Sequence, residues 1–272
     1  MISYAFEIVS GEAAAGTADV DATAGLATIT LDRPDKLNAL NAQALRELDA
    51  AYARAQQDGA RAVLLRGAGR AFCAGRDISD VDPAADDVPG FLDGLVAPLM
   101  RRIAAFPAPT FAAAHGACLG VGLGLLIATD VVYVSNDAKI GSPFAALGAA
   151  LDSGGHALFV DRLGAHRTLD LVFTGRLMSG DEAVRSGLFS RAVPPDELEA
   201  VTRDAAVAAA SGATAAFVAS KQLVARLRDE RIGLWDALAA ETRAQTALRD
   251  TADYREGFAA FQQKRRPVFR GR

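Results

Sequence analysis

The segment TFAAAHGACLGVGLGLLIATDVVYVS, residues 110–135, gives the clearest indication of the fold class. Its composition predicts an apolar strand at 110–116, a glycine-containing loop at 117–122, an apolar helix at 123–129 and a second apolar strand at 130–135. Two apolar strands joined by a helix indicate parallel neighbours in one sheet, because parallel strands need a crossover connection. The stretch therefore favours an α/β fold.

The residues before this stretch continue the alternation of strand and helix. LATITL (26–31) alternates threonines with Ile and Leu, which is typical of a strand, and AVLLRG (62–67) is a short apolar strand. Apolar residues recur at helical spacing over 40–57, and a second helical stretch covers 89–106. The small and polar residues 10–25 are expected to form a loop or a hairpin tip.

Beyond residue 161 the pattern becomes helical to the C-terminus. No change in composition marks a linker, so we expect one main domain with a helical appendage. The sequence predicts an α/β core with a mostly parallel sheet over residues 1–200, followed by a helical C-terminal region over 201–272. The expected helical stretches are 163–175, 179–187, 195–210, 214–228, 233–248 and 251–264.

Composition and charge argue against several classes of protein. The 272 residues are 51% hydrophobic and carry a net charge of -4, which suits a full core and argues against nucleic-acid binding. Two cysteines cannot build a disulfide framework, and three histidines without a Cys/His cluster predict no metal site. Prolines and glycines interrupt the longest uncharged run, 103–129, so we expect no membrane span. The N-terminus lacks the pattern of a signal peptide, and we expect a cytoplasmic protein.

Two glycine-bearing loops, RAFCAGRDIS (70–79) and HGACLGVGLG (115–124), each follow an apolar strand. Neither contains GxxxxGK[ST] or GxGxxG, so neither fits a known phosphate-binding loop. Glycine allows backbone N–H groups to approach a ligand closely. Two such loops at strand ends could direct two N–H donors at one oxygen, the arrangement that stabilises an enolate or a tetrahedral oxyanion. Each loop taken alone is explained equally well by tight packing of a helix on a sheet.

Six segments, in order and over nearly the whole chain, share one family pattern. They are ITLDRPDKLNALN (29–41), RAFCAGRDIS (70–79), HGACLGVGLGLLIATDVVY (115–133), LGAALDSGGHALFVDRLG (147–164), FTGRLMSGDEAVRSGLFSRAVP (173–194) and DYREGFAAFQQKRRPVFRGR (253–272). Together they resemble the enoyl-CoA hydratase/isomerase (crotonase) superfamily. The resemblance implies repeated ββα units and a C-terminal helical region that forms trimers, often paired into hexamers. It also implies an acyl-CoA thioester as substrate, with no cofactor beyond the coenzyme A that the substrate carries.

The same resemblance implies two oxyanion donors on the glycine loops. One is the N–H of Arg76, which precedes Asp77 in the AGRD block, where Ala74 is expected to face the substrate. The other is the N–H of Val121, at a place where family members mostly carry Gly. A backbone N–H survives that replacement, although a β-branched side chain is expected to narrow the pocket.

The acid and base residues divide the family. Hydratases carry two glutamates at the positions of Gly124 and Phe144, and neither residue can move a proton. Asp152 resembles the single catalytic aspartate of several family isomerases, including a ring-opening epoxide isomerase and double-bond shifters. One carboxylate can remove a proton from one carbon and return it to another if apolar surroundings raise its pKa. Phe144, Leu147 and Leu151 could supply those surroundings.

Other interpretations of Asp152 remain open. An Asp before a glycine turn commonly caps the following helix. Halide-displacing members use an Asp at this place as a nucleophile, but they add a histidine that the segment 91–106 lacks. The favoured function is therefore an enoyl-CoA or related epoxide isomerase. The alternatives are an enoyl-CoA hydratase or other lyase, and a non-catalytic acyl-CoA binding protein.

The resemblance also implies contacts with coenzyme A. Near the C-terminus, Phe261 and Lys264 match a pair that often reaches the coenzyme A of a neighbouring subunit, although a short basic run is equally typical of a solvated tail. The first segment contributes two side chains and neighbouring backbone: Arg33, Lys36, Leu37 and Ala39.

Three further residues are expected to have structural roles. Asp77 is expected to fix its loop through local hydrogen bonds. The resemblance also implies that Asp77 and Phe144 border the substrate. His115 opens the second glycine loop and is expected to bond to backbone rather than to catalyse. Cys73 is expected to pack as a small apolar side chain.

Overall fold

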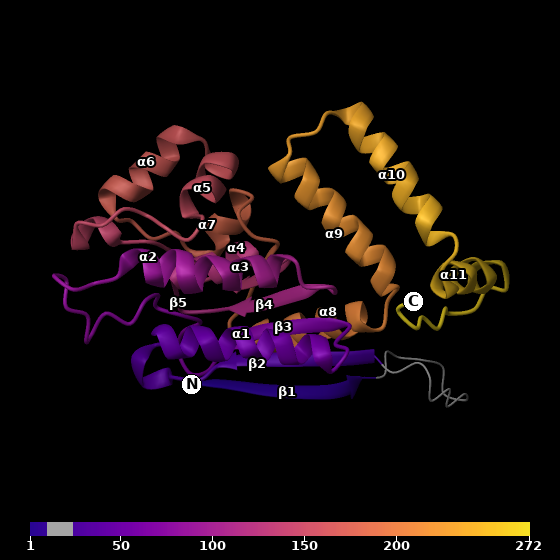
Figure 1. Ribbon diagram of the computed structural model, residues 1–272, viewed down its shortest axis with the longest axis horizontal. Coiled ribbons are helices and arrows are strands. Elements are labelled where there is room, and N and C mark those ends of the chain that lie inside the picture. Colours follow the sequence, from indigo (N-terminus) through magenta and orange to yellow (C-terminus); the bar gives the residue numbers. More distant parts are fainter. Residues whose placement is uncertain (10–23) are drawn as a thin grey trace.

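A six-stranded sheet forms the centre of the computed structural model, which describes residues 1–9 and 24–272 (Figure 1). The strand order is β1-β2-β3-β4-β6-β8, and every neighbouring pair is parallel except β1 with β2. This confirms the predicted mostly parallel sheet. The strands are β1 (Ile2–Val9), β2 (Ala24–Leu31), β3 (Ala62–Gly67), β4 (Thr110–Ala114), β6 (Val131–Ser135) and β8 (Arg191–Val193).

Each face of the sheet packs against a hydrophobic cluster. Because successive side chains of a strand point to opposite sides, neighbouring residues enter different clusters. In β3, Val63 and Leu65 belong to the larger hydrophobic cluster, while Ala62 and Leu64 belong to the smaller one. The helices of the larger cluster include α1 (Ala42–Gln57), α3 (Ala97–Ala104) and α4 (Val121–Ala128). On the opposite face the smaller cluster packs under α8 (Leu198–Ala210).

A second, two-stranded sheet pairs β5 (Ala117–Leu119) with β7 (Lys139–Gly141) in parallel. The loop predicted at 117–122 is therefore wrong, since its first half is β5 and helix α4 already begins at Val121. β5 is a strand because β7 pairs with it, and Cys73 adds two further hydrogen bonds: the Cys73 N–H donates to the Ala117 carbonyl, and the Cys73 carbonyl accepts from the Leu119 N–H. Three residues are too few to show a strand period in sequence.

Two other expectations need correction. Residues 10–23 of the loop predicted at 10–25 lie outside the described residues, and the last two positions belong to β2, where Gly25 pairs with Ile8. The chain is not wholly helical beyond residue 161, because β8 adds an edge to the sheet beside β6. Residue 200, the expected boundary between the core and the C-terminal region, lies within α8, and the division itself stays a prediction.

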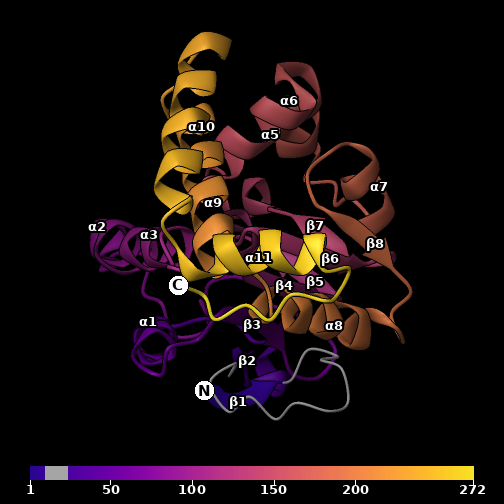
Figure 2. The ribbon, with the colours of Figure 1, turned by 90° about the vertical axis from the view of Figure 1, so that its right-hand side faces the viewer.

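The remaining helices lie above and beside the sheet. Figure 1 shows α11 at the opposite end of the molecule from α2 and α6, and in Figure 2, which is viewed from that end, α11 lies in front. Among the residues described, no single helix is long and apolar enough to cross a membrane; α8 and α9 reach that length and composition only together, across a bend of 108°. The bounds are η1 (Pro34–Lys36), α2 (Val88–Phe91), a π-helical turn η2 (Leu92–Val96), η3 (Phe144–Leu147), α5 (Gly155–Leu163), α6 (Ala165–Thr174), α7 (Gly180–Arg185), α9 (Thr214–Asp229), α10 (Leu234–Leu248) and α11 (Ala252–Gln262).

Candidate active site

The two glycine loops pack against each other, backbone to backbone. Gly75 and Gly120 both have positive φ, 102° and 52°. A Cβ built on either glycine would lie 3.8 Å from the Cα of the other. The Cβ on Gly75 would also lie 3.1 Å from the carbonyl oxygen of Leu119, and the one on Gly120 would lie 2.8 Å from the Phe144 ring. A side chain at Gly75 would therefore press against the Leu119 backbone of the second loop, and one at Gly120 would clash with the Phe144 ring.

The residues after these glycines present backbone donors that the fold leaves available. Leu40 pairs with the loop on both sides of Arg76: it donates to the Gly75 carbonyl at 2.8 Å and accepts from the Asp77 N–H at 2.9 Å. The N–H of Arg76 therefore points away from that pairing. Val121 is the first residue of α4, where N–H groups lack helical partners. Within the described residues, neither N–H has a hydrogen-bond partner.

Asp152 lies just before a strained turn at the start of α5. Ser153 and Gly154 both have left-handed φ, 51° and 80°. The Asp152 carboxylate accepts a hydrogen bond from the Ser153 hydroxyl at 2.8 Å. The residue that caps α5 is Gly154, with no side-chain hydrogen bond to the helix. The alternative in which Asp152 caps this helix is therefore wrong.

The surroundings of Asp152 favour its neutral form. Burial raises the pKa of the Asp152 carboxyl, and the Ser153 hydroxyl and the positive charge of Arg76 offset only part of that rise. Leu151 is buried beside it, whereas Leu147 is 62% exposed, so the expectation that Leu147 shields the carboxyl is wrong. The apolar surroundings come from the protein interior rather than from the exposed end of η3.

The described residues hold no group of three or more His, Cys, Asp or Glu side chains placed to share a metal ion. Cys73 and Cys118 are free and buried, and Cys73 packs as predicted. The ring Nε2 of His115 lies 2.9 Å from the backbone oxygen of Gly69, which confirms its expected bond to backbone.

A family model described as enoyl-CoA hydratase/isomerase matches residues 21–272. The chain belongs to the enoyl-CoA hydratase/isomerase family. This confirms the resemblance found in the six sequence segments and the fold class that it implied.

Family relatives with different activities align over most of the chain. A Rhodobacter capsulatus protein named "Probable enoyl-CoA hydratase" is 39% identical over 249 residues, covering 91% of this chain and 95% of the relative. The 1,2-epoxyphenylacetyl-CoA isomerase of Escherichia coli is 32% identical over 253 residues, covering 91% and 96%. A Mycobacterium abscessus crystal structure named for the enoyl-CoA hydratase/isomerase class has a TM-score of 0.85 at 32% identity, covering 99% of this chain and 100% of that chain.

Position 124, where family hydratases are expected to carry a glutamate, has no room for a side chain here. A Cβ on Gly124 would lie 2.6 Å from the Cβ of Ser153. Ser153 thus occupies the space that any side chain at position 124 would need. At position 144, where the second hydratase glutamate is expected, the Phe144 ring lies against Gly120 of the second glycine loop.

The segment expected to contact coenzyme A, residues 33–39, is bonded to the first glycine loop, 70–79. The Arg33 guanidinium donates to the Ala39 carbonyl at 2.9 Å and pairs with Asp77 at 3.0 Å, so its charge is already engaged. Lys36 is exposed and donates to the Ser79 hydroxyl at 3.3 Å. Asp77 accepts from the Ser79 N–H and hydroxyl, at 3.2 and 2.6 Å, which confirms its predicted local hydrogen bonds.

A residue that sequence reasoning passed over orders this segment. Leu37 and Asn38 both have left-handed φ, and the buried Asn38 amide donates to the Ala68 and Ala71 carbonyls at 2.8 and 2.7 Å. The turn holds Leu37 so that its carbonyl accepts from the Ala74 N–H at 2.9 Å. An asparagine between two apolar residues in a turn segment was the available signal.

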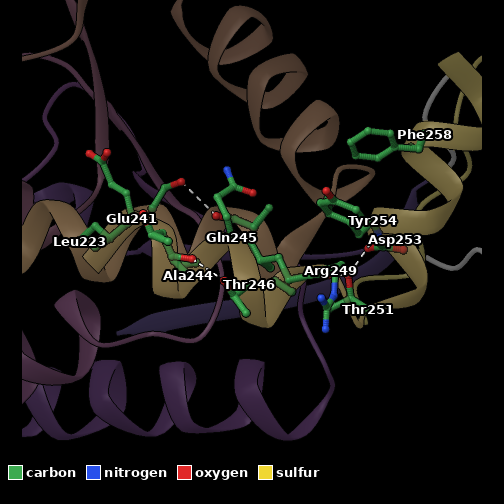
Figure 3. Close-up of a pocket in the computed structure, with 18 of the residues that line it drawn as sticks. Leu223, Glu241, Ala244, Gln245, Thr246, Arg249, Thr251, Asp253, Tyr254 and Phe258 are labelled. Atoms are coloured by element: carbon green, nitrogen blue, oxygen red, sulfur yellow. Dashed lines mark hydrogen bonds between the residues drawn. The ribbon is translucent and has the colours of Figure 1, made fainter. Parts of the chain in front are cut away.

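The structure does not bring Phe261 and Lys264 to Asp152 within one chain. Phe261 belongs to α11 and Lys264 follows it, at the end of the molecule opposite α2 and α6 (Figures 1 and 2). Phe261 lines a groove of about 1080 Å³ between α9, α10 and α11, here called the α9–α11 groove. Figure 3 shows the groove with Leu223, Gln245 and Phe258 around it. The groove lies apart from the glycine loops.

Proposed function

We propose that the protein is an acyl-CoA thioester isomerase that uses one carboxylate and two backbone donors. The observation that carries the proposal is the close approach of the turn after Asp152 to Gly124, where an added Cβ would lie 2.6 Å from the Cβ of Ser153. Asp152 supplies one half-buried carboxyl of raised pKa, and Ser153 fills the space that a side chain at position 124 would need. Isomerisation needs one proton-transfer group, whereas the family's hydration chemistry is expected to use two.

The proposed reaction moves one proton within the substrate. The thioester oxygen accepts hydrogen bonds from the N–H groups of Arg76 and Val121. Asp152 removes a proton from the carbon next to the carbonyl of a 3-enoyl-CoA, and the C–H electron pair moves into a dienolate. The protonated Asp152 then returns the proton to the far end of the conjugated system, and the negative charge leaves the oxygen. No water or redox partner enters the balance, and coenzyme A is part of the substrate.

The residues around the two backbone donors and in the segment 33–39 supply the proposed substrate contacts. Ala74 and Phe144 border the two donors, and Lys36 is the exposed cation of the segment expected to meet coenzyme A. Arg33 serves this segment through its pair with Asp77. We infer that Leu37 and Ala39 present their backbone there.

Hydration is the second candidate, favoured by relatives named as hydratases. In that reaction Asp152 would act on a water molecule that adds across the double bond of a 2-enoyl-CoA. A third possibility is a protein that binds acyl-CoA without turning it over.

A panel of thioesters separates these functions. A 3-enoyl-CoA, a 2-enoyl-CoA and an epoxidised phenylacetyl-CoA are assayed with the wild type, Asp152→Asn and the control Asp161→Asn. Asp161 is an acidic residue of α5 in surface ion pairs, so its replacement makes the same charge change outside the site. Isothermal titration with a saturated acyl-CoA measures binding in each protein.

We expect isomerisation without hydration, lost by at least 10²-fold in Asp152→Asn and kept in Asp161→Asn. Hydration of the 2-enoyl-CoA that survives Asp152→Asn would overturn the proposal. Binding without turnover across the panel would favour the binding protein instead.

We infer that subunits associate as a trimer, or a pair of trimers, through the α9–α11 groove. Its lining includes Val224, Leu227, Leu238, Phe258 and Phe261, all exposed apolar side chains in the single chain. Apolar surface of this extent is typical of a protein interface. Such an assembly would let Phe261 and Lys264 reach a neighbour's substrate.

A further inference from the structure

The side chain of Arg76 is held on two sides. Its guanidinium makes a bidentate ion pair with Asp86, with N–O distances of 2.9 and 2.5 Å. It also lies over the Phe91 ring, 4.1 Å from the ring centroid. A planar guanidinium suits both contacts, because it matches a carboxylate fork and stacks on an aromatic face. The guanidinium is therefore fixed rather than free.

These contacts join separate parts of the site. Asp86 lies in the segment that leads into α2, and Phe91 is the last residue of α2. Arg76 lies on the first glycine loop and carries a backbone N–H donor. The ion pair and the ring contact thus connect α2 and the segment before it, 79–87, to the first glycine loop, which carries the Arg76 N–H.

Arg76 is also the charged side chain that acts on Asp152. Its positive charge partly offsets the raised pKa of the Asp152 carboxyl. Among the elements around Asp152, α4 (VGLGLLIA) and η3 (FAAL) carry no charged residue. The titratable residues of α5, His156, Asp161 and Arg162, are exposed, and the last two pair with each other. In α3, Arg101 is exposed and Arg102 pairs with Asp49. The charges that matter here are therefore those of Asp152, Arg76 and the Asp86 carboxylate that engages Arg76.

We propose that Asp86 is a positioning residue for the reaction: its carboxylate holds the Arg76 guanidinium against Phe91 and so keeps it from pairing with Asp152. The inference rests on the proposed role of Asp152 as the base. A guanidinium released from Asp86 has Asp152 as an alternative anionic partner. A direct Arg–Asp pair would stabilise the ionised carboxylate and make it a weaker base.

The test compares Asp86→Asn with two matched variants. Asp86→Glu keeps a carboxylate that can engage Arg76, and Asp80→Asn makes the same charge change at an exposed position of the same segment. For Asp86→Asn we expect kcat to fall about tenfold with little change in KM, and the acidic limb of the kcat profile to move to lower pH. Asp86→Glu should restore both, and Asp80→Asn should behave as the wild type.

A second readout does not need turnover. The difference infrared spectrum between each protein and its Asp152→Asn counterpart reports the protonated carboxyl of Asp152 as pH changes. We expect its titration to shift to lower pH in Asp86→Asn and, by less, in Phe91→Leu, which removes the aromatic platform. If isomerase activity is absent throughout, this titration still decides the inference separately from the proposed function.

The Arg76→Gln background shows whether Asp86 acts through Arg76. Arg76→Gln keeps the backbone N–H and removes the cation, so adding Asp86→Asn should give little further shift. An unchanged Asp152 titration in Asp86→Asn would overturn the inference. A shift of equal size in the Arg76→Gln background would overturn it too, because Asp86 would then act on Asp152 directly.

Discussion

The backbone carbonyl of Ser153 faces Gly124 so closely that a Cβ on Gly124 would lie 3.0 Å from the carbonyl oxygen. The contact is made by the left-handed turn of Ser153 and Gly154, which brings the chain after Asp152 down onto α4. The same added Cβ would lie 3.3 Å from the sulfur of Met100 in α3. The turn that follows Asp152 can thus pack on α4 because residue 124 has no side chain.

Replacing Gly124 by alanine should destabilise the protein and disturb Asp152. The new methyl group meets backbone as well as side chain, so we expect a loss of about 1–3 kcal/mol and a large loss of isomerase activity. Gly94→Ala is the matched control, because it lies in η2 with nothing within 4 Å of its added Cβ. That variant should gain about 0.5–1 kcal/mol. Urea unfolding measures both, and equal midpoints would contradict the packing argument.

Asp253 is expected to hold the C-terminal segment through two charge-assisted hydrogen bonds. Its buried carboxylate accepts from the backbone N–H groups of Arg270 and Gly271, at 2.7 and 2.8 Å. The buried Arg61 guanidinium donates to the Phe269 carbonyl of the same segment at 3.1 Å. Asp253→Asn should lower the free energy of unfolding by about 2–4 kcal/mol. The exposed Asp250→Asn should change it by less than about 0.5 kcal/mol, and a similar loss in both variants would refute this role.

Long periodic elements of this fold could be predicted from the sequence. The helix expected over 40–57 is α1, which starts two residues later because the Asn41 side chain accepts from the Ala44 N–H as its cap. The strands at 26–31 and 62–67 lie within β2 and β3. These segments carry enough residues for their period to be read.

The short strands could not be predicted. β5, β7 and β8 have three residues each, and each is a strand only because a distant segment pairs with it. In the candidate site, the resemblance pointed to Arg76, Val121 and Asp152, and the structure brings their loops together. The pairing of Arg76 with Asp86 had no sequence signal, because ten residues in a loop carry no fixed geometry.

The wild-type chain should self-associate through the α9–α11 groove, and charges placed there should prevent it. Leu238 and Phe261 line the groove and are 51% and 85% exposed, so neither aspartate variant loses core packing. We expect Leu238→Asp and Phe261→Asp to shift sedimentation from a trimer or hexamer toward the monomer. Ile8→Asp, on the edge strand β1, is the control and should sediment as the wild type. A monomeric wild type would contradict the expectation.

Asp152→Asn should make the folded protein more stable at neutral pH. The pKa of the Asp152 carboxyl is raised in the folded state, so the folded protein binds this proton more tightly than the unfolded chain does. Stability therefore falls as pH rises from the unfolded pKa through the folded one, and the cost is fully present above both. The asparagine variant carries no such cost.

The difference in unfolding free energy between Asp152→Asn and the wild type should accordingly shrink as pH falls. Below the unfolded pKa of an ordinary Asp, about 3.9, both proteins carry a neutral group at residue 152 and the difference from ionisation vanishes. Urea unfolding at a series of pH values measures it. The proposed reaction needs the charged form of Asp152, whereas burial makes that form less stable. Activity and stability therefore make opposite demands on this side chain, and this pH dependence follows. A variant less stable than the wild type at neutral pH, with no pH dependence, would mean that Asp152 holds the turn instead.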